Sequence, residues 1–191
     1  MEALLRWNDP VRGEVFPKDF ISVAEDLGLI VQMGEWAFRN ACGQLRAWEA
    51  EGIRDVAVAV NLSPRQFMSR KLVPTLLGIV REAGVDPKHV EVEITETMVM
   101  RNLEQSIETL TQLRSVGMQV AVDDFGVGYS SLNQLTRLPA SSMKIDRSFI
   151  MNLPDDEDSG SITEAIIAMA KRLKLRVIAE KPLATRRADF E

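Results

Sequence analysis

The stretch Val90-Glu91-Val92-Glu93-Ile94-Thr95-Glu96 decides the fold, because apolar and acidic side chains alternate along it. A strand has a side-chain period of two. Glu91 and Glu93 therefore share one face, and the branched apolar residues between them share the other. The apolar face predicts covering helices, and the acidic face places a carboxylate where the strand ends. This stretch predicts one strand of an α/β sheet with polar groups gathered at one edge.

Five other short apolar runs follow the same design, since each ends on a carboxylate, an amide or an amine with matching parity. These runs are 2–6, 57–61, 119–124, 143–146 and 177–180, and their polar exits are Glu2, Asn61, Asp123, Lys144 with Asp146, and Glu180. Acidic groups assembled at strand C-termini are typical of a metal-dependent α/β barrel site. The alternative, that these are separate solvated acids at strand ends, is disfavoured because six exits share one parity.

Helical patterns fill the segments between the runs. They cover 17–27, 33–51, 71–83, 102–116 and 162–173, and the first four stop at a glycine, a common helix C-cap. The acidic, turn-rich segment 153–160 is expected to be a solvated loop. Alternation of strand and helix implies parallel strands with helices outside. A closed (β/α)8 barrel needs eight strands, so the fold class is α/β, a TIM-like barrel that is incomplete, with about six of eight strands.

Composition narrows the classes of function. The chain has 191 residues, 46% of them hydrophobic and 27% charged, with a net charge of −5, which fits one globular domain. The acidic balance argues against DNA as a partner. A single cysteine excludes a disulfide framework and a thiolate zinc site. No run of about 18 apolar residues predicts a membrane span and no signal peptide is visible, so we expect a cytoplasmic location.

The adjacent carboxylates Asp123 and Asp124 suggest metal chemistry. Successive side chains diverge, so one would enter the barrel and the other would lie on its rim, and one carboxylate could bridge two cations. Oxygen-rich sites suit Mg²⁺, Mn²⁺ or Ca²⁺ rather than zinc. Two such ions are the standard apparatus of phosphodiester hydrolysis, in which Lys144 could orient the nucleophile. The further oxygen ligands would be Glu2, Asn61, Glu93 and Glu180.

The same residues resemble the signature of EAL domains, the cyclic di-GMP phosphodiesterases of bacterial signalling. The matching segments, in chain order, are Glu2-Ala3-Leu4-Leu5-Arg6-Trp7, Val60-Asn61-Leu62-Ser63, Glu93-Ile94-Thr95-Glu96, Asp123-Asp124-Phe125-Gly126 with the following 127–132, Lys144-Ile145-Asp146, and Ala179-Glu180. The resemblance covers about residues 1–180, which we take as the core of an EAL domain, with 181–191 as an atypical C-terminal tail.

The resemblance implies hydrolysis of cyclic di-GMP to linear pGpG with two Mg²⁺ or Mn²⁺ ions, and with Ca²⁺ as an inhibitory substitute. By position, the first ion would be held by Glu2, Asn61, Glu93 and Asp123, and the second by Asp123, Asp124 and Glu180. Lys144, Glu180 and Glu96 would serve catalysis, with Lys144 on the attacking water and Glu96 pinning the loop that follows Asp124. Leu4, Arg6 and Asp146 would bind substrate, Arg6 at a phosphate.

The chain departs from the family pattern at several places. A strand bearing Tyr-Gln-Pro is missing before Glu2, Glu180 is followed by Lys181-Pro182-Leu183 instead of Gly-Val-Glu, and Val127 replaces a threonine. We therefore expect an EAL domain truncated at both ends, with unpaired sheet edges that favour a homodimer or other self-association. Sensory or GGDEF domains are the expected fusion partners or regulators. The alternatives are a non-hydrolysing module that binds cyclic di-GMP or a protein, and an inactive fragment.

Overall fold

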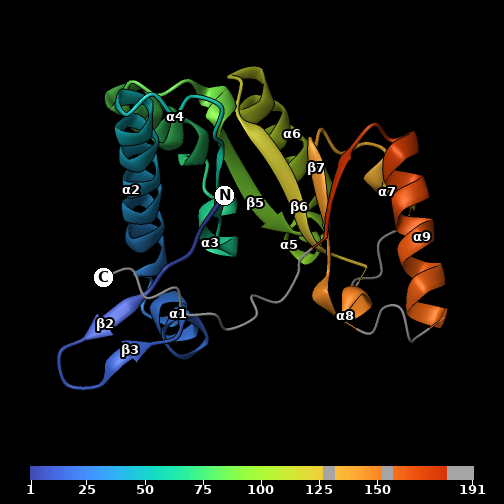
Figure 1. Ribbon diagram of the computed structural model, residues 1–191, viewed down its shortest axis with the longest axis horizontal. Coiled ribbons are helices and arrows are strands. Elements are labelled where there is room, and N and C mark those ends of the chain that lie inside the picture. The colour runs from blue at the N-terminus through green and yellow to red at the C-terminus, as the bar shows by residue number, and fades with distance from the viewer. Residues whose placement is uncertain (127–131, 152–156, 180–191) are drawn as a thin grey trace.

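A single curled sheet forms the centre of the molecule, seen here in a computed structural model that describes residues 1–126, 132–151 and 157–179. Within these residues the sheet has six strands in the order β1-β4-β5-β6-β7-β8, and every neighbouring pair is parallel. Their bounds are β1 Glu2–Ala3, β4 Val58–Asn61, β5 Val90–Thr95, β6 Gln119–Phe125, β7 Ser142–Ile145 and β8 Arg176–Ala179. The sheet curls as part of a barrel (Figure 1). The predicted incomplete TIM-like barrel is confirmed.

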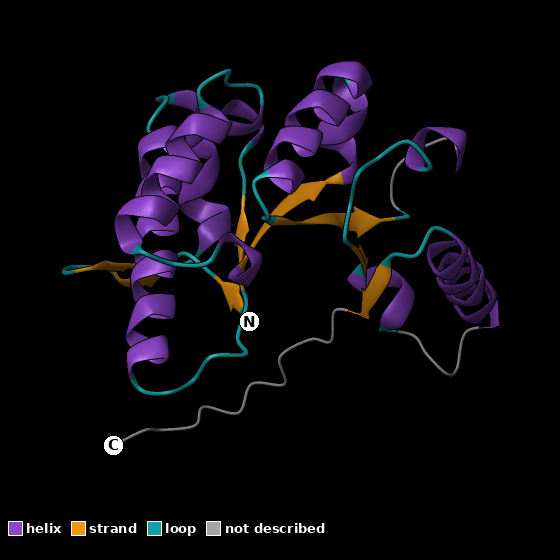
Figure 2. Ribbon diagram, turned by 90° about the horizontal axis from the view of Figure 1, so that it is seen from above, coloured by secondary structure: helices purple, strands orange, loops and turns teal. Residues whose placement is uncertain are grey.

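Helices cover the outer face of this sheet (Figure 2). They are α2 Ile30–Ala50, α3 Pro64–Phe67, α4 Leu72–Ala83, α5 Glu96–Arg101, α6 Leu103–Ser115, α7 Leu132–Leu135, α8 Arg147–Ile150 and α9 Glu157–Arg172, with a 3₁₀ turn at Pro87–His89. No helix in the described part of the chain is long and apolar enough to cross a membrane. The loop expected at 153–160 is wrong from Glu157 onward, where α9 begins. Acidic residues are also favoured in the first turn of a helix, so composition alone did not separate the two structures.

The N-terminal run is shorter and more complex than predicted. β1 ends at Ala3, and the chain then forms a separate antiparallel hairpin of β2 (Trp7–Asp9) and β3 (Gly13–Val15), followed by α1 (Pro17–Asp26). The hairpin turn is held by Asp9, whose Oδ1 accepts hydrogen bonds from the backbone N–H groups of Val11 and Arg12. The hairpin and α1 lie beside the N-terminal end of α2 (Figure 1).

The core lies between the sheet and its helices. The branched residues of the central strands are almost fully buried: Val92 and Val120 are 0% exposed and Ile94 is 1% exposed. They pack in one cluster with helix residues that include Phe38, Leu76, Leu110 and Leu113. Full burial of each such side chain contributes roughly 1.5–3 kcal/mol. This packing makes a one-residue slip of any strand costly, since a slip would exchange its two faces, and it therefore determines which polar groups face inward.

A close approach between α2 and α3 depends on a glycine. A Cβ on Gly34 would meet the side-chain amide of Gln66, with the Nε2 atom only 2.2 Å away. Gln66 is buried and completes a capping box, because its Oε1 accepts hydrogen bonds from the backbone N–H and the hydroxyl of Ser63. Gln66 cannot move aside without losing this cap, which starts α3 directly after β4.

Two glycine substitutions in α2 should therefore have opposite effects. Gly34→Ala should lower the free energy of unfolding by about 1–3 kcal/mol, as overpacking does. Gly43→Ala, in the same helix and with nothing within 4 Å of the added Cβ, should raise it by up to about 1 kcal/mol through helix propensity. Urea unfolding followed by circular dichroism measures both. Equal effects of the two substitutions would contradict the close approach.

Candidate functional site

The carboxylates of three strands converge on one ammonium group. The Nζ atom of Lys144 on β7 lies 3.0 Å from Glu93 Oε2 on β5, 3.1 Å from Asp123 Oδ2 on β6, and 3.5 Å from Glu2 Oε2 on β1. The side chain of Lys144 is 5% exposed and that of Glu93 is 3% exposed. All four residues lie on the inner face of the sheet, as their parity predicted. We call them, together with Asn61, the carboxylate cluster.

Asn61 joins the cluster from β4. Its Nδ2 donates a hydrogen bond of 2.8 Å to Glu2 Oε1, and Asn61 stands in register with Glu93 on the neighbouring strand. The amide therefore leaves its carbonyl oxygen as a further acceptor at the same edge of the sheet. Five of the residues predicted for the site are thus brought together by five different strands.

The cluster carries more negative than positive charge. The pKa of Glu93 is raised from its ordinary value to about 7, chiefly by burial and also by the negative charges of Glu2 and Asp123, against the opposing effect of the Lys144 ammonium. Three carboxylates face one ammonium, so an excess of negative charge remains when all four groups are ionised. Such an excess in a poorly solvated site attracts cations.

The donor atoms fit a hard divalent cation, since carboxylate and amide oxygens are the ligands that Mg²⁺ and Mn²⁺ take. Within the ranges that the structure describes, however, no three acidic, histidine or cysteine side chains already form a ligand cage. The carboxylates lie around the ammonium of Lys144 instead. Glu180, predicted both as a ligand and as a catalytic residue, lies outside the described residues. The ligand assignments therefore stay predictions.

Asp124 diverges from Asp123, as expected of two successive residues at a strand exit. Its backbone is left-handed, with φ 53, and its N–H donates a 2.8 Å hydrogen bond to Asp123 Oδ1. Asp124 is exposed whereas Asp123 is buried. Non-glycine residues adopt this conformation at some cost, and aspartate is among those that tolerate it best. The turn therefore fixes one carboxylate inside the sheet and sends the other to the rim.

Glu96 holds the backbone just beyond this turn. Its Oε2 accepts a 3.1 Å hydrogen bond from the N–H of Gly126, and Glu96 is 2% exposed. Gly126 has φ 101, and a Cβ there would lie 2.8 Å from the ring of Phe149. This contact agrees with the expectation that Glu96 pins the segment following Asp124, although residues 127–131, with the substituted Val127, lie outside the described part.

The residues predicted to bind substrate make local contacts of their own. Leu4 is 48% exposed, and Arg6 contacts the backbone oxygen of Leu5 and, at 3.5 Å, the carboxylate of Glu14. Asp146 caps α8, where its Oδ1 accepts a hydrogen bond from the N–H of Ser148. Hydrogen bonds from Ser148 are the main cause that lowers the pKa of Asp146. Their substrate roles stay predictions.

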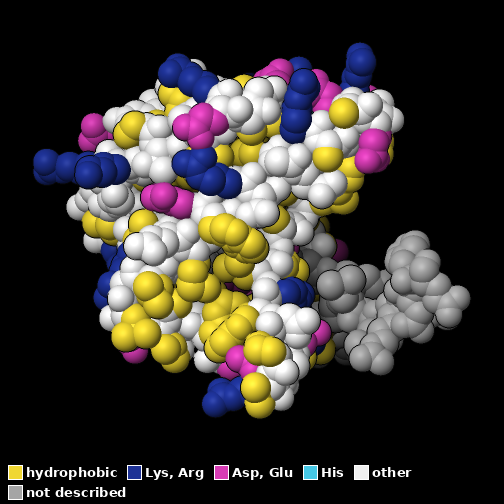
Figure 3. Space-filling view, turned by 90° about the vertical axis from the view of Figure 1, so that its left-hand side faces the viewer, with side chains coloured by type: hydrophobic (Ala, Val, Ile, Leu, Met, Phe, Trp, Pro, Cys, Tyr) yellow, Lys and Arg dark blue, Asp and Glu magenta, His cyan; other side chains and the backbone are white. Residues whose placement is uncertain are grey.

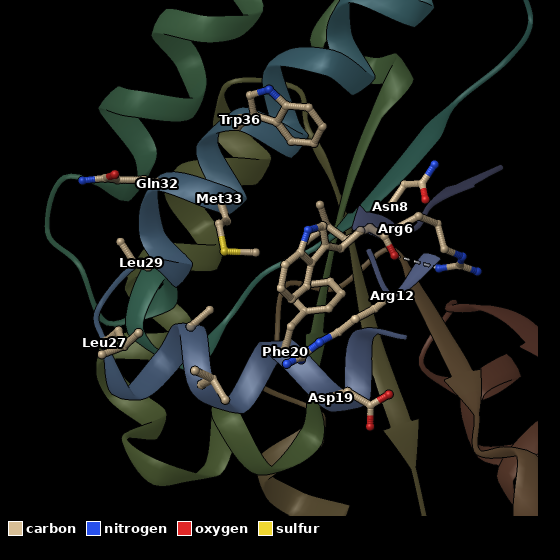
Figure 4. A pocket seen from close by; sticks show the side chains of 14 residues that line it. Arg6, Asn8, Arg12, Asp19, Phe20, Leu27, Leu29, Gln32, Met33 and Trp36 are labelled. Carbon is tan, nitrogen blue, oxygen red and sulfur yellow. Dashed lines mark hydrogen bonds between the residues drawn. The ribbon is translucent and has the colours of Figure 1, made fainter. Parts of the chain in front are cut away.

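Sequence reasoning missed a cavity of about 750 Å³ between the hairpin, α1 and α2. Arg6 and Asn8 line it from the hairpin side, and Met33 and Trp36 from α2 (Figure 4). Trp7 of β2 also lines the cavity. Trp7 packs edge-on against Phe20 of α1 at a ring distance of 5.9 Å. Hydrophobic side chains gather on this side of the molecule (Figure 3). In the sequence, Trp7 directly follows Arg6, and a tryptophan next to a predicted substrate-binding residue could have indicated a cavity. Other lining residues come from α1 and α2, and the sequence pattern does not show how these helices lie relative to Trp7.

Removal of the buried ammonium tests the electrostatics of the cluster. Lys144→Met, studied in chelator, should lower the free energy of unfolding by about 3 kcal/mol or more near pH 8. The pKa of Glu93 in the folded chain, about 7, lies above its ordinary value of 4.5. Its burial penalty is therefore absent below pH 4.5 and complete above about pH 7. Loss of the ammonium enlarges that penalty. The difference in free energy of unfolding between Lys144→Met and the parent chain, which we call the deficit, should therefore be smaller near pH 5 than near pH 8.

Urea unfolding at both pH values measures the deficit, and Lys171→Met, an exposed lysine of α9, is the matched control. A deficit independent of pH, or one no larger than that of the control, would contradict a buried charge cluster.

Known proteins place the chain in a family. The model of the EAL domain matches residues 1–181. The bifunctional diguanylate cyclase/cyclic di-GMP phosphodiesterase MucR of Pseudomonas aeruginosa is 44% identical over 94% of this chain and 26% of its own length. The cyclic di-GMP phosphodiesterase PdeR of Escherichia coli is 40% identical over 94% of the chain and 27% of its own length. The chain spans about a quarter of the length of these curated relatives.

Solved structures agree with the sequence comparison. The PaMucR phosphodiesterase in complex with c-di-GMP superposes with a TM-score of 0.90 at 43% identity, covering 95% of this chain and 74% of that one. The FimX EAL domain of Pseudomonas aeruginosa bound to c-di-GMP gives a TM-score of 0.85 at 25% identity, covering 95% of this chain and 73% of that one. On the match of the family model and these relatives, the chain belongs to the EAL domain family.

Proposed function

We propose that this chain is the core of a metal-dependent phosphodiesterase that hydrolyses cyclic di-GMP to linear pGpG. The observation that carries the proposal is the convergence of Glu2, Glu93 and Asp123 from three strands on a single buried point. Relatives that are named cyclic di-GMP phosphodiesterases support the choice of substrate. A cyclic dinucleotide also fits the acidic chain, because bound cations can offset the charge of its two phosphates.

Carboxylate and amide side chains at this edge of the sheet would hold two Mg²⁺ or Mn²⁺ ions. The first ion would be held by Glu2, Asn61, Glu93 and Asp123, and the second by Asp123, Asp124 and Glu180. When bound, the ions would supply a nucleophilic water at neutral pH and neutralise charge on the phosphoryl oxygens. Ca²⁺, with looser coordination, would bind and inhibit.

The protein's own groups would orient the reactants. Carboxylates from other strands hold the ammonium of Lys144 at the edge of the sheet, where it would orient the attacking water. Arg6 and Leu4 would contact the substrate from the segment between β1 and the hairpin, and Asp146 from the exit of β7. Glu96 would keep the backbone at Gly126 in place during the reaction.

A second function, binding of cyclic di-GMP without turnover, is favoured by one observation. The carboxylates already surround an ammonium, and no ready ligand cage exists within the described ranges. Hydrolysis and binding without turnover differ in one measurable property, the release of pGpG in the presence of Mg²⁺ or Mn²⁺.

We also propose that the chain works in the cytoplasm as part of a larger assembly. Its relatives are roughly four times as long, and MucR is named as both a cyclase and a phosphodiesterase. Sensory or GGDEF domains, which the family resemblance implies, would then regulate the site.

Self-association is the other proposed interaction. Within the described residues β1 pairs with β4 alone and β8 pairs with β7 alone, so both edges of the sheet present backbone groups for pairing. Sedimentation equilibrium of the 191-residue chain should show dimers or larger species that dissociate on dilution. A strict monomer up to about 100 μM, well above the concentration at which a micromolar dimer forms, would contradict this proposal.

The metal experiment decides between the two functions. Purified chain should convert cyclic di-GMP to pGpG in Mg²⁺ or Mn²⁺, and excess chelator should abolish the conversion because the proposed ions would supply the nucleophilic water. Ca²⁺ should support binding without turnover. Chromatography of the products measures turnover, and calorimetry measures binding. Binding without turnover in every metal would favour the second function, and turnover in chelator would overturn the metal-dependent mechanism.

Two substitutions test the different roles proposed for Asp123, a ligand that bridges both ions, and Glu96, a residue that holds the backbone at Gly126. Asp123→Asn should abolish turnover, because it removes the carboxylate expected to bridge both ions. Glu96→Gln should retain weak turnover, reduced by about 10–100-fold, the typical loss for residues that support metal ligands. Activity assays at saturating Mn²⁺ measure both, and comparable losses would contradict the assignment.

A further inference from the structure

A second buried carboxylate lies below the cluster, and neither the sequence motifs nor the proposed mechanism uses it. Glu91 of β5 is 4% exposed. Its Oε1 accepts a 2.8 Å hydrogen bond from the hydroxyl of Ser142 on β7, and its Oε2 lies 2.6 Å from the NH2 atom of Arg176 on β8. One side chain thus connects three strands, reaching past β6.

The contact of Glu91 with Ser142 repeats the contact of Glu93 with Lys144, two residues earlier along the same two strands. Glu91 and Glu93 are two residues apart on the inner face of β5, and Ser142 and Lys144 are two residues apart on the inner face of β7. Glu91 contacts Ser142, and Glu93 contacts Lys144. Ala121 of β6 stands in register with both Glu93 and Ser142, and its small side chain leaves room for the glutamates to reach across.

β8 lies at the end of the described sheet, where Val177 packs against the core beneath α9. In the described part of the chain it pairs with β7 alone, over four residues from Ser142↔Arg176 to Ile145↔Ala179. The ion pair of Arg176 with Glu91 ties this strand back to β5, three strands away along the sheet. The side chain of Arg176 is 62% exposed, but that of Glu91 is only 5% exposed, so loss of Arg176 would leave a buried carboxylate without its cation and would also cost stability. The geometric role of Arg176 must therefore be tested separately from stability.

We propose that Arg176 is a positioning residue: through Glu91 and Ser142 it sets the curl of β5–β8, and this curl places the ammonium of Lys144 between Glu93 and Asp123. The consequence for turnover rests on the proposed function, whereas the consequence for Lys144 does not. A shift of about 1 Å at a reacting group can reduce turnover by about 100-fold, so a modest change in curl has a large effect. Substrate affinity, which draws on other contacts, should change little.

Two readouts on Arg176→Met test the proposal. In the first, reductive methylation of lysines is followed by mass spectrometry. Lys144 should be methylated about tenfold faster than in the parent chain, because the carboxylates that cover its ammonium move apart. Cys42, which is 1% exposed in α2, reports global opening, and its reaction with a thiol reagent should stay unchanged. In the second, kcat for cyclic di-GMP should fall by about tenfold or more while KM stays within about threefold.

Two further variants make the test specific. Arg176→Lys keeps a cation within reach of Glu91 and should restore part of both properties. Arg39→Met removes an exposed ion pair with Glu82 between α2 and α4, away from the inner face, and should leave both unchanged.

Parent-like methylation of Lys144 in Arg176→Met would overturn the proposal, as would a gain in Cys42 reactivity that matches the gain at Lys144. If the parent chain itself shows no turnover, the proposed function fails, and the methylation rates still decide the positioning role. If Arg176→Met does not fold, Arg176→Lys is compared with the parent by the same two readouts.

Discussion

A buried ammonium among carboxylates is the constraint on which the inner face of this protein depends. Lys144 contacts Glu93, Asp123 and Glu2, which come from three other strands. Each carboxylate in such a position costs desolvation energy that a nearby cation must offset. The strands can therefore hold these acids together only while their curl keeps the ammonium within reach. The apolar outer face supplies the energy for this arrangement, since residues such as Val92 and Val120 are fully buried against helices.

Strand parity explains why much of the site could be predicted from the sequence. Alternation along 90–96 and 119–124 separates the acids from the branched residues without knowledge of any contact, and parallel strands bring their C-terminal ends to one edge. The cluster of Glu2, Asn61, Glu93, Asp123 and Lys144 follows from these two facts. Six strands in sequence order also follow from the alternation of strand and helix.

Other features could not be predicted because they depend on where elements meet in space. The run 2–6 was assigned to one strand, yet the chain leaves the sheet after Ala3 and forms a hairpin held by Asp9. The cavity beside Arg6 needs the relative placement of α1 and α2. Glu91 had the right parity but no motif, and its importance appears only when the curl brings Arg176 to it. The side-chain period and the sequence motifs describe one strand or helix at a time. The hairpin, the cavity and the contact of Glu91 with Arg176 depend on how two or more such elements are placed in space.

Three departures from local rules lie around the cluster. A lysine is buried, the pKa of a glutamate is raised, and Asp124 adopts a left-handed backbone at the end of a strand. Proteins retain such costs mainly where function requires them. The excess of negative charge is a further cost of this kind, and a bound cation would offset it and stabilise the folded chain. The features that are costly for the fold in this region are therefore those that the proposed binding of cations would use.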